Sequence, residues 1–239
     1  MNNKLLFFIA LTALPGPALA QAEACRPAAS VPAYDVARPD GPSRRTPVAG
    51  YLLSLSWSPE YCRTRASRAG DRLQCGGAGG RFGFILHGLW PEAAGPDYPR
   101  YCQPAGRVPE AVMRRHLCMT PSASLIQHEW QKHGSCGWSD PARYLAAADR
   151  LWRALRFPDM DGLSRRGVTA GAVARAFADI NPGLPVDAVR ITANRRQWLE
   201  EVTICLGRDF RPRACPAHVR GVQARVPVSI WRGGSPPRG

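Results

Sequence analysis

The order of apolar and polar positions predicts several strands along the chain. Residues 50–57 read Gly-Tyr-Leu-Leu-Ser-Leu-Ser-Trp, and this partial period of two is typical of a strand with one buried face. An apolar run at the end of 81–86 predicts a second, buried strand that places His87 at its end. Further strands are expected over 199–206 and within 219–231.

Apolar residues recur at helical spacing in the middle of the chain. In 141–155 they are Tyr144, Leu145, Ala148, Leu151, Trp152 and Leu155, which fall on one face of a helix. A second helix runs from Ser122 or Ser124, as N-cap, to His133, and Gly134 ends it. Two more helices are expected over 109–117 and 169–180, with loops over 59–80 and 95–107.

The first twenty residues have the pattern of a secretory signal peptide. Lys4 precedes an apolar run, and small residues lead to a predicted cut after Ala20. The alternative is a membrane anchor, but about ten apolar residues cannot span roughly 30 Å of hydrocarbon. We therefore expect a secreted or periplasmic protein that does not associate with a membrane.

The rest of the chain predicts a single catalytic domain without internal repeats. Residues 21–48 are rich in Pro and Ala and predict an extended N-terminal arm. The domain itself is expected over 49–232, with a disordered tail over 233–239. The predicted divisions are therefore 1–20, 21–48, 49–232 and 233–239.

Eight cysteines lie downstream of the predicted cut. An even number in an exported chain favours disulfides. A zinc site would favour closely paired ligands such as Cys-x-x-Cys, and the chain has no such pair. The spacing of the cysteines leaves many pairings open.

The formal net charge of +14 is carried almost entirely by arginine, because only Lys4 and Lys132 are lysines among the 32 basic residues. A basic surface attracts polyanions such as nucleic acid. An arginine-rich solvated surface would give the same total, so charge alone favours a polyanion partner only modestly.

Two short motifs contain three of the five histidines. The first is Phe-Ile-Leu-His-Gly-Leu-Trp-Pro around His87, and the second is His-Glu-Trp-Gln-Lys-His-Gly-Ser-Cys from His128. On a helix, His128, Glu129, Lys132 and His133 fall within an arc of roughly 140°. The second motif therefore gathers its polar groups on one face, while Trp130 points elsewhere as a core anchor.

The opening of the second motif is close to the zinc-protease pattern His-Glu-x-x-His. That pattern needs a histidine four residues after the first, so that both nitrogens reach one metal. Here that position is Lys132, a cation. The spacing argues against a metal site.

Cleavage of RNA needs these residue types without a nucleophilic Ser or Cys, because the ribose 2′-hydroxyl is the nucleophile. The reaction needs a base for that hydroxyl, an acid for the departing 5′ oxygen, and cations for the phosphoryl oxygens. Histidine has a reference pKa near 6.5, so one imidazole can be neutral while another is protonated.

The two motifs resemble the signature segments of the ribonuclease T2 family. The similarity extends to residues 51–62, 177–184 and 199–205 and to Cys215-Pro216, and so covers most of 50–216. It implies an α+β fold, with a central, mainly antiparallel sheet, helices packed around it and disulfides stapling a single domain. Ser135 stands where the family usually has threonine.

The resemblance also implies roles for the matching side chains. His133 would be the general base and His87 the general acid, although these two roles could be exchanged. His128 would bind phosphate, while Glu129 and Lys132 would stabilise the transition state. The base-binding candidates are Trp90, Glu92 and Tyr98, with core packing as the alternative role of Trp90.

The same resemblance implies disulfides Cys102–Cys136 and Cys205–Cys215. The remaining expected pairs are Cys62–Cys75 and Cys25–Cys118.

We therefore expect a monomeric endoribonuclease that converts single-stranded RNA, through a 2′,3′-cyclic phosphate, to 3′-phosphate ends. It should need no cofactor or metal and should not cleave DNA, which lacks the attacking hydroxyl. The alternative is a non-catalytic protein of the same fold that binds nucleic acid or another polyanion. A zinc hydrolase would differ from both in losing activity to chelators.

Overall fold

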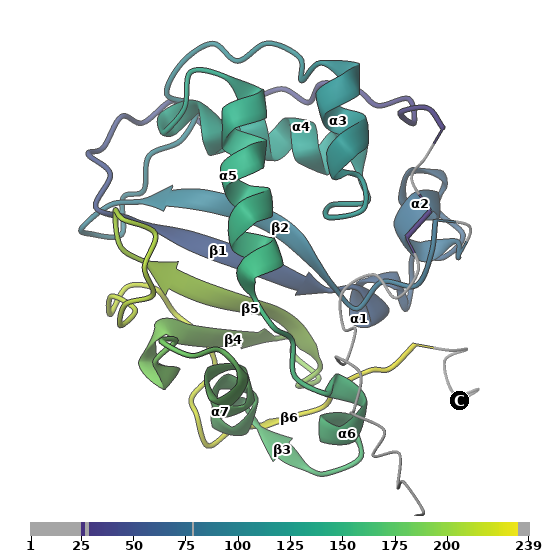
Figure 1. Ribbon diagram of the computed structural model, residues 1–239, viewed down its shortest axis with the longest axis vertical. Coiled ribbons are helices and arrows are strands. Elements are labelled where there is room, and N and C mark those ends of the chain that lie inside the picture. Colours follow the sequence, from purple (N-terminus) through teal and green to yellow (C-terminus); the bar gives the residue numbers. More distant parts are fainter. Residues whose placement is uncertain (1–24, 27–28, 78, 234–239) are drawn as a thin grey trace, which may run out of the picture.

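A four-stranded antiparallel sheet forms the centre of the molecule, in the strand order β2-β1-β5-β4 (Figure 1). The computed structural model describes residues 25–26, 29–77 and 79–233. The strands are β1 (Gly50–Trp57), β2 (Phe84–Glu92), β4 (Val189–Ala193) and β5 (Leu199–Leu206). A smaller ladder pairs β3 (Val168–Thr169) with β6 (Pro227–Val228).

The side chains of strand β1 alternate between an apolar face and a polar face of the sheet. Leu53, Leu55 and Trp57 are buried in the hydrophobic core. Because side chains alternate along a strand, Ser54 and Ser56 face the other way, and both hydroxyls bond to Glu201 on β5. In the Leu-Ser-Leu-Ser-Trp sequence, the apolar residues thus pack in the core, while the two serines contribute to the polar face.

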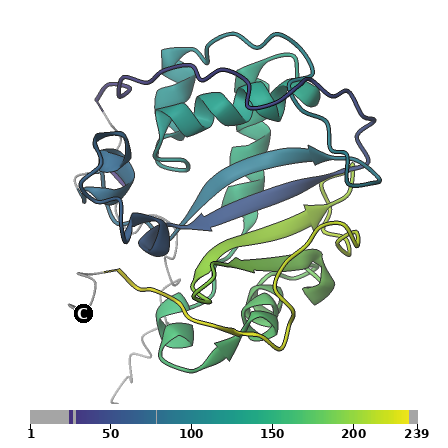
Figure 2. The same ribbon diagram turned by 180° about the vertical axis from the view of Figure 1, so that it is seen from behind.

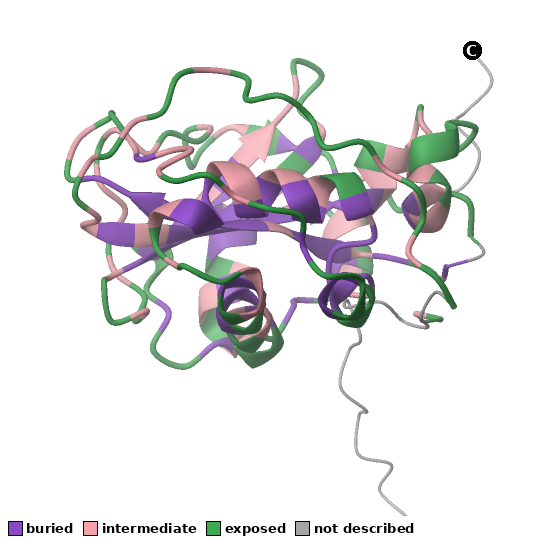
Figure 3. Cartoon of the chain, turned by 90° about the horizontal axis from the view of Figure 1, so that it is seen from above, coloured by how far each residue is buried: buried purple, intermediate pink, exposed green. Residues whose placement is uncertain are grey.

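Helices pack around this sheet. Helix α5 (Pro141–Ala154) crosses β1 and β2, α7 (Ala170–Ile180) lies beside β4, and α3 (Glu110–His116) and α4 (Ala123–Lys132) lie beyond the β2 edge (Figure 1). Seen from above, the sheet is a largely buried layer with exposed helix surfaces outside it (Figure 3). The expected α+β architecture is confirmed.

Shorter helical turns fill the connections. They are α1 (Ser58–Cys62), η1 (Ala69–Asp71), α2 (Arg72–Cys75), η2 (Gly134–Cys136), α6 (Met160–Ser164) and η3 (Val186–Ala188). The expected loop over 59–80 is therefore partly helical. The Cys62–Cys75 disulfide joins the two ends of this segment.

All four expected disulfides are present. Cys25–Cys118 joins the N-terminal arm to the chain after α3, and Cys102–Cys136 joins the 95–107 loop to the turn after α4. Cys62–Cys75 and Cys205–Cys215 close short segments. The arm and the loop are thus anchored beside helix α4.

Most expected elements form within a few residues of their predicted bounds, and three expectations need correction. Strand β2 continues through His87 to Glu92, because Pro91 lies on an edge strand, where a missing N–H is tolerated. The 219–231 region contributes only the two residues of β6. Strand β4 was not expected, although Val-Arg-Ile-Thr-Ala alternates.

The predicted signal peptide lies outside the described residues, as does the tail beyond Gly233. In the part of the chain that the structure describes, no helix has the length and apolar character needed to cross a membrane.

Phe84 is the centre of an aromatic cluster in the core. Its side chain is 0% exposed, and its ring centroid lies 4.8 Å from that of Trp57 and 5.5 Å from those of Phe157 and Phe177. We expect Phe84→Ala to lower the free energy of unfolding by about 3–5 kcal/mol, because it removes these contacts and leaves a cavity.

Urea unfolding with the disulfides intact measures this loss. Val186→Ala is the control, because Val186 is 40% exposed, and its effect should stay within about 0.5 kcal/mol. A loss below about 1 kcal/mol for Phe84→Ala would show that the cluster does not organise the core.

Candidate functional site

A β-bulge in strand β2 presents His87. Along the β1–β2 ladder, Ser54 pairs with Gly88 and Leu55 with Leu86, so His87 has no partner residue in the register. An extra residue of this kind bends the strand and re-aims its side chain. The imidazole consequently reaches Glu201 on β5 through Nδ1 and lies 3.6 Å from Glu129 Oε1 through Nε2.

The buried Glu129 carboxylate connects helix α4 to strand β2. Glu129 is 3% exposed, and the Trp90 indole N–H donates a hydrogen bond of 2.6 Å to its Oε2. Gly88 makes this approach possible, because a Cβ atom there would overlap both the Glu129 carboxylate and Trp90 Nε1. The Gly-Leu-Trp part of the first motif therefore positions the second motif.

Helix α4 begins and ends as its sequence predicts. The Ser122 hydroxyl accepts a hydrogen bond from the Leu125 N–H at the N-cap, and His133 is the C-cap residue. Trp130 is 3% exposed and donates to the Gly106 carbonyl at 3.2 Å, which confirms that it anchors the helix in the core. Gly134 allows the turn that follows, because a Cβ there would lie 2.7 Å from the Trp130 ring.

His133 lies in a stack of aromatic rings. The Trp90 ring stacks on its imidazole at 5.3 Å between centroids, and Tyr98 stacks on it at 5.8 Å. The other contact of Trp90 is edge-on with His87 at 5.2 Å. The Trp90 ring thus lies between the two histidines. His133 is 7% exposed, and its Nδ1 has no hydrogen-bond partner among the described residues.

The N-terminal arm reaches the site at Lys132. Lys132 Nζ donates to Asp40 Oδ2 at 2.6 Å, and the Tyr101 hydroxyl donates to Asp40 Oδ1 at 2.9 Å. Tyr34, also in the arm, bonds to Gln127 on α4, and the arm runs along this helix (Figure 2). Sequence reasoning did not anticipate Asp40, because no local pattern links it to a residue so distant in sequence.

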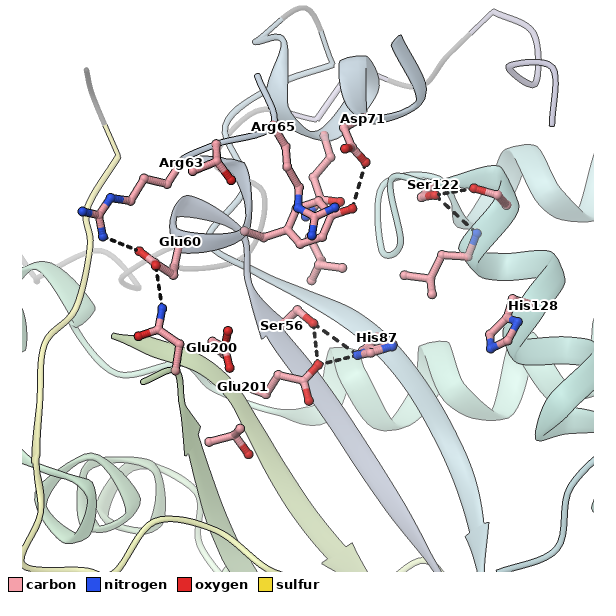
Figure 4. A pocket seen from close by; sticks show the side chains of 18 of the residues that line it. Ser56, Glu60, Arg63, Arg65, Asp71, His87, Ser122, His128, Glu200 and Glu201 are labelled. Atoms are coloured by element: carbon pink, nitrogen blue, oxygen red, sulfur yellow. Dashed lines mark hydrogen bonds and ion pairs between the residues drawn. The ribbon is translucent and has the colours of Figure 1, made fainter. Parts of the chain in front are cut away.

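His128 and His87 line a pocket of about 1100 Å³. His128 comes from the helix side and His87 from the sheet side (Figure 4). The other charged residues of its lining are of both signs: Arg63, Arg65 and Arg196, and the carboxylates Glu60, Asp71, Glu200 and Glu201. Sequence reasoning missed Glu201, which lies in this pocket between Ser56 and His87 (Figure 4).

The protonation preferences of His87 and His133 are opposite. Burial lowers the pKa of His133 to about 3, and the charges of Lys132 and His128 add to this shift. Burial acts in the same direction on His87, but the hydrogen bond to Glu201 and the charge of Glu129 outweigh it and raise its pKa above 6.5. At neutral pH, His133 is therefore unprotonated, while the surroundings of His87 favour its protonated form.

The remaining charged groups are also shifted. Burial raises the pKa of Glu129 to about 7, against the influence of His87 and Trp90. The hydrogen bond from Lys132 lowers the pKa of Asp40 to about 2. Burial lowers the pKa of His128, and Lys132 lowers it further. Asp40 therefore carries a negative charge beside Lys132 across the physiological range.

The base-binding candidates lie in different surroundings. Tyr98 is partly exposed above His133, and Trp90 is engaged with Glu129 and both histidines. The Glu92 carboxylate is buried and bonds to His218 Nε2 at 3.1 Å. None of the three lines the pocket that His87 and His128 share, and their role in base binding stays a prediction. No group of metal-ligating side chains occurs among residues 25–26, 29–77 and 79–233.

The amino-acid sequence is similar to those of known ribonucleases. The model of the ribonuclease T2 family matches residues 49–215. A ribonuclease of Aeromonas hydrophila is 32% identical over 165 residues, which are 66% of this chain and 72% of that protein. A Haemophilus influenzae protein named Probable ribonuclease is 37% identical over 132 residues, and the match covers 50% of this chain and 47% of that protein. The chain thus spans about half the length of this second relative.

Solved structures share the fold. RNase NT in complex with 5′-AMP has a TM-score of 0.62 at 17% identity, over 77% of this chain and 98% of that one. Trichomaglin, described as an S-like ribonuclease, has a TM-score of 0.60 at 18% identity, over 77% and 97% of the two chains.

Gly88 is the position where a single methyl group would most directly disturb the site. We expect Gly88→Ala to lower the free energy of unfolding by about 1–3 kcal/mol, because the new Cβ must push Glu129 away from Trp90. Chemical unfolding measures the change.

The matched control is Gly95→Ala, because a Cβ at Gly95 would meet no heavy atom within 4 Å. Equal stability of the two variants would show that the contact between β2 and α4 has room for a side chain.

Proposed function

Because the chain belongs to the ribonuclease T2 family, we propose that it is an endoribonuclease that cleaves single-stranded RNA. The ribose 2′-hydroxyl attacks the adjacent phosphate, and a 2′,3′-cyclic phosphate forms as the 5′ oxygen of the next nucleotide leaves. Hydrolysis of the cyclic ester then yields a 3′-phosphate. The solved relative RNase NT is in complex with 5′-AMP, which supports a nucleotide ligand for this fold.

The observation that carries the proposal is the pair of histidines with opposite protonation preferences beside the Trp90 ring. His133, with its pKa at about 3, accepts the proton of the 2′-hydroxyl. His87, whose pKa is raised, donates a proton to the departing oxygen. General acid–base pairs of this kind contribute about 10²–10⁴-fold per group.

The charged groups around the histidines support the transition state. His128 binds a phosphate oxygen, a role supported by its position in the lining of the pocket that contains His87. Lys132 neutralises negative charge on the phosphoryl group. In the structure, the ammonium of Lys132 donates a hydrogen bond to Asp40 instead. The RNA phosphate and Asp40 therefore compete for one cation. Glu129 stabilises the protonated His87 from the buried side.

The bases on either side of the cleaved bond have different surroundings. Tyr98, together with Trp90 and Glu92, is proposed for one base, because aromatic faces stack on unpaired bases. The pocket that contains His87 and His128 has the volume for a nucleotide. Electrostatic attraction to the RNA backbone follows from the formal net charge of +14.

We propose that the enzyme works as a monomer outside the cytoplasm, after removal of residues 1–20. Four disulfides support this location, because such bonds persist in oxidising compartments.

Incubation of the protein with single-stranded RNA and matched DNA, with EDTA present, tests the function. We expect RNA to be cut to cyclic-phosphate and then 3′-phosphate ends, while DNA stays intact because it has no 2′-hydroxyl. Loss of activity in EDTA or cutting of DNA would refute the proposal. Binding without cleavage would favour a polyanion-binding protein.

His87→Ala and His133→Ala should each lower kcat/KM on RNA by about 10²–10⁴-fold while the protein stays folded. The control is His116→Gln, because His116 bonds to the Val112 carbonyl within α3 and takes no part in the site. Residual activity within tenfold of the wild type, for either alanine variant, would contradict the assigned roles.

The dependence of kcat/KM on pH should be bell-shaped. Activity needs His133 neutral, so the acid limb should fall near its pKa of about 3. It also needs His87 protonated, so activity should be lost as pH rises through a pKa above 6.5. A dinucleotide substrate measured over a wide pH range tests both limbs. Activity that rises through pH 7 to a plateau would instead make His87 the base.

A further inference from the structure

Glu201 is a partly buried carboxylate of the site and has no part in the acid–base steps proposed for the histidines. It lies on β5, directly opposite Ser56 in the β1–β5 register, and it shares the polar face of the sheet with His87. Its side chain is 23% exposed. A carboxylate in such a position needs a physical reason, because burying a charge without partners is unfavourable.

Three side chains satisfy the Glu201 carboxylate. Oε1 accepts from the Ser56 hydroxyl at 2.9 Å and bonds to His87 Nδ1, while Oε2 accepts from the Ser54 hydroxyl at 3.4 Å. Burial by itself would raise the pKa of Glu201, but the bonds to His87 and Ser56 lower it below 4.5. The carboxylate is therefore a negative charge, held by hydrogen bonds to neighbouring strands of one sheet.

The imidazole of His87 lies between two carboxylates that differ in how closely they approach it. Glu201 contacts Nδ1, and Glu129 Oε1 lies 3.6 Å from Nε2. The distance to Glu129 is too long for a hydrogen bond, whereas Glu201 makes one. The bond at Nδ1 is consequently the durable one, and a bond at one ring nitrogen determines which proton the other carries.

We propose that Glu201 is a positioning residue for His87: it holds a proton on Nδ1 and aims Nε2–H at the departing 5′ oxygen. The proposal rests on the ribonuclease function proposed above. The other charged or titratable groups that act on His87 come from α4 and its C-cap, namely His128, Glu129, Lys132 and His133. Glu201 acts on His87 from the opposite side, through β5.

The proton balance of the first step follows from this arrangement. The bond from the 2′ oxygen to phosphorus forms as the bond to the 5′ oxygen breaks. The proton of the 2′-hydroxyl passes to His133, and the Nε2 proton of His87 passes to the departing 5′ oxygen. His87 is left neutral with its Nδ1–H still bonded to Glu201. In hydrolysis of the cyclic phosphate, Nε2 takes a proton from the attacking water, which restores the imidazolium. The bond from phosphorus to the 2′ oxygen breaks, and that oxygen takes the proton held by His133.

Glu201→Gln tests the proposal, because it removes the charge and keeps the shape. Glu110→Gln is the matched control: Glu110 is an exposed glutamate in the first turn of α3, and it does not line the pocket that contains His87. Two substrates are compared. One is a dinucleotide, and the other is a uridine 3′-phosphodiester of 4-nitrophenol, whose oxygen leaves without needing a proton.

We expect Glu201→Gln to lower kcat/KM on the dinucleotide by about 10²-fold, at the lower end of what a general acid contributes, and on the nitrophenyl ester by less than about threefold. Without the negative charge the imidazolium is less stable, so the basic limb of the dinucleotide profile should move to lower pH. The His87 resonances, followed by NMR through a pH titration, should show the same downward shift. Glu110→Gln should behave as the wild type in all three measurements.

Equal losses on both substrates would overturn the proposal, because they would mean that Glu201 only maintains the structure. An unchanged His87 titration in Glu201→Gln would also overturn it. The titration is independent of turnover, so a wild-type protein without any ribonuclease activity would refute the proposed function while the contact between Glu201 and His87 could still be measured.

Discussion

The hydrogen bond from the Trp90 indole to the Glu129 carboxylate joins the two elements that carry the candidate catalytic groups. Strand β2 supplies His87 and Trp90, while helix α4 and its C-cap supply His128, Glu129, Lys132 and His133. Glycine at position 88 lets the carboxylate approach the strand closely. The same Trp90 ring contacts both histidines. A shift between β2 and α4 would therefore change the distances of the proposed acid His87 from both the proposed base His133 and the Glu129 carboxylate.

The N-terminal arm is attached to this centre although it lies outside the segment that matches the family. The Cys25–Cys118 disulfide anchors its start, and Asp40 bonds to Lys132. A carboxylate on this lysine satisfies the ammonium when no phosphate is bound. The solitary lysine of the second motif is thus connected to a part of the chain that the motif does not predict.

Local pattern was enough to predict β1, β5, the principal helices and the residues of the two motifs, because alternation, capping and spacing are local properties. The arrangement around His87 was not predictable in this way. Glu201 and Ser56 reach it through sheet register, and Asp40 reaches Lys132 through the path of the arm. The bulge that re-aims His87 depends on pairing with β1. The Val-Arg-Ile-Thr-Ala alternation of β4 was a usable local signal that the sequence analysis overlooked.

The account depends on burial and charge separating the two histidines in their affinity for a proton. Burial without an acidic partner favours neutral His133, whereas Glu201 and Glu129 favour protonated His87. NMR titration of the histidine rings in the folded wild-type protein measures this directly, with single His→Gln variants to assign the signals. The account predicts a His87 pKa above 6.5 and a His133 pKa at about 3. Equal values for the two rings, or a higher value for His133, would contradict it.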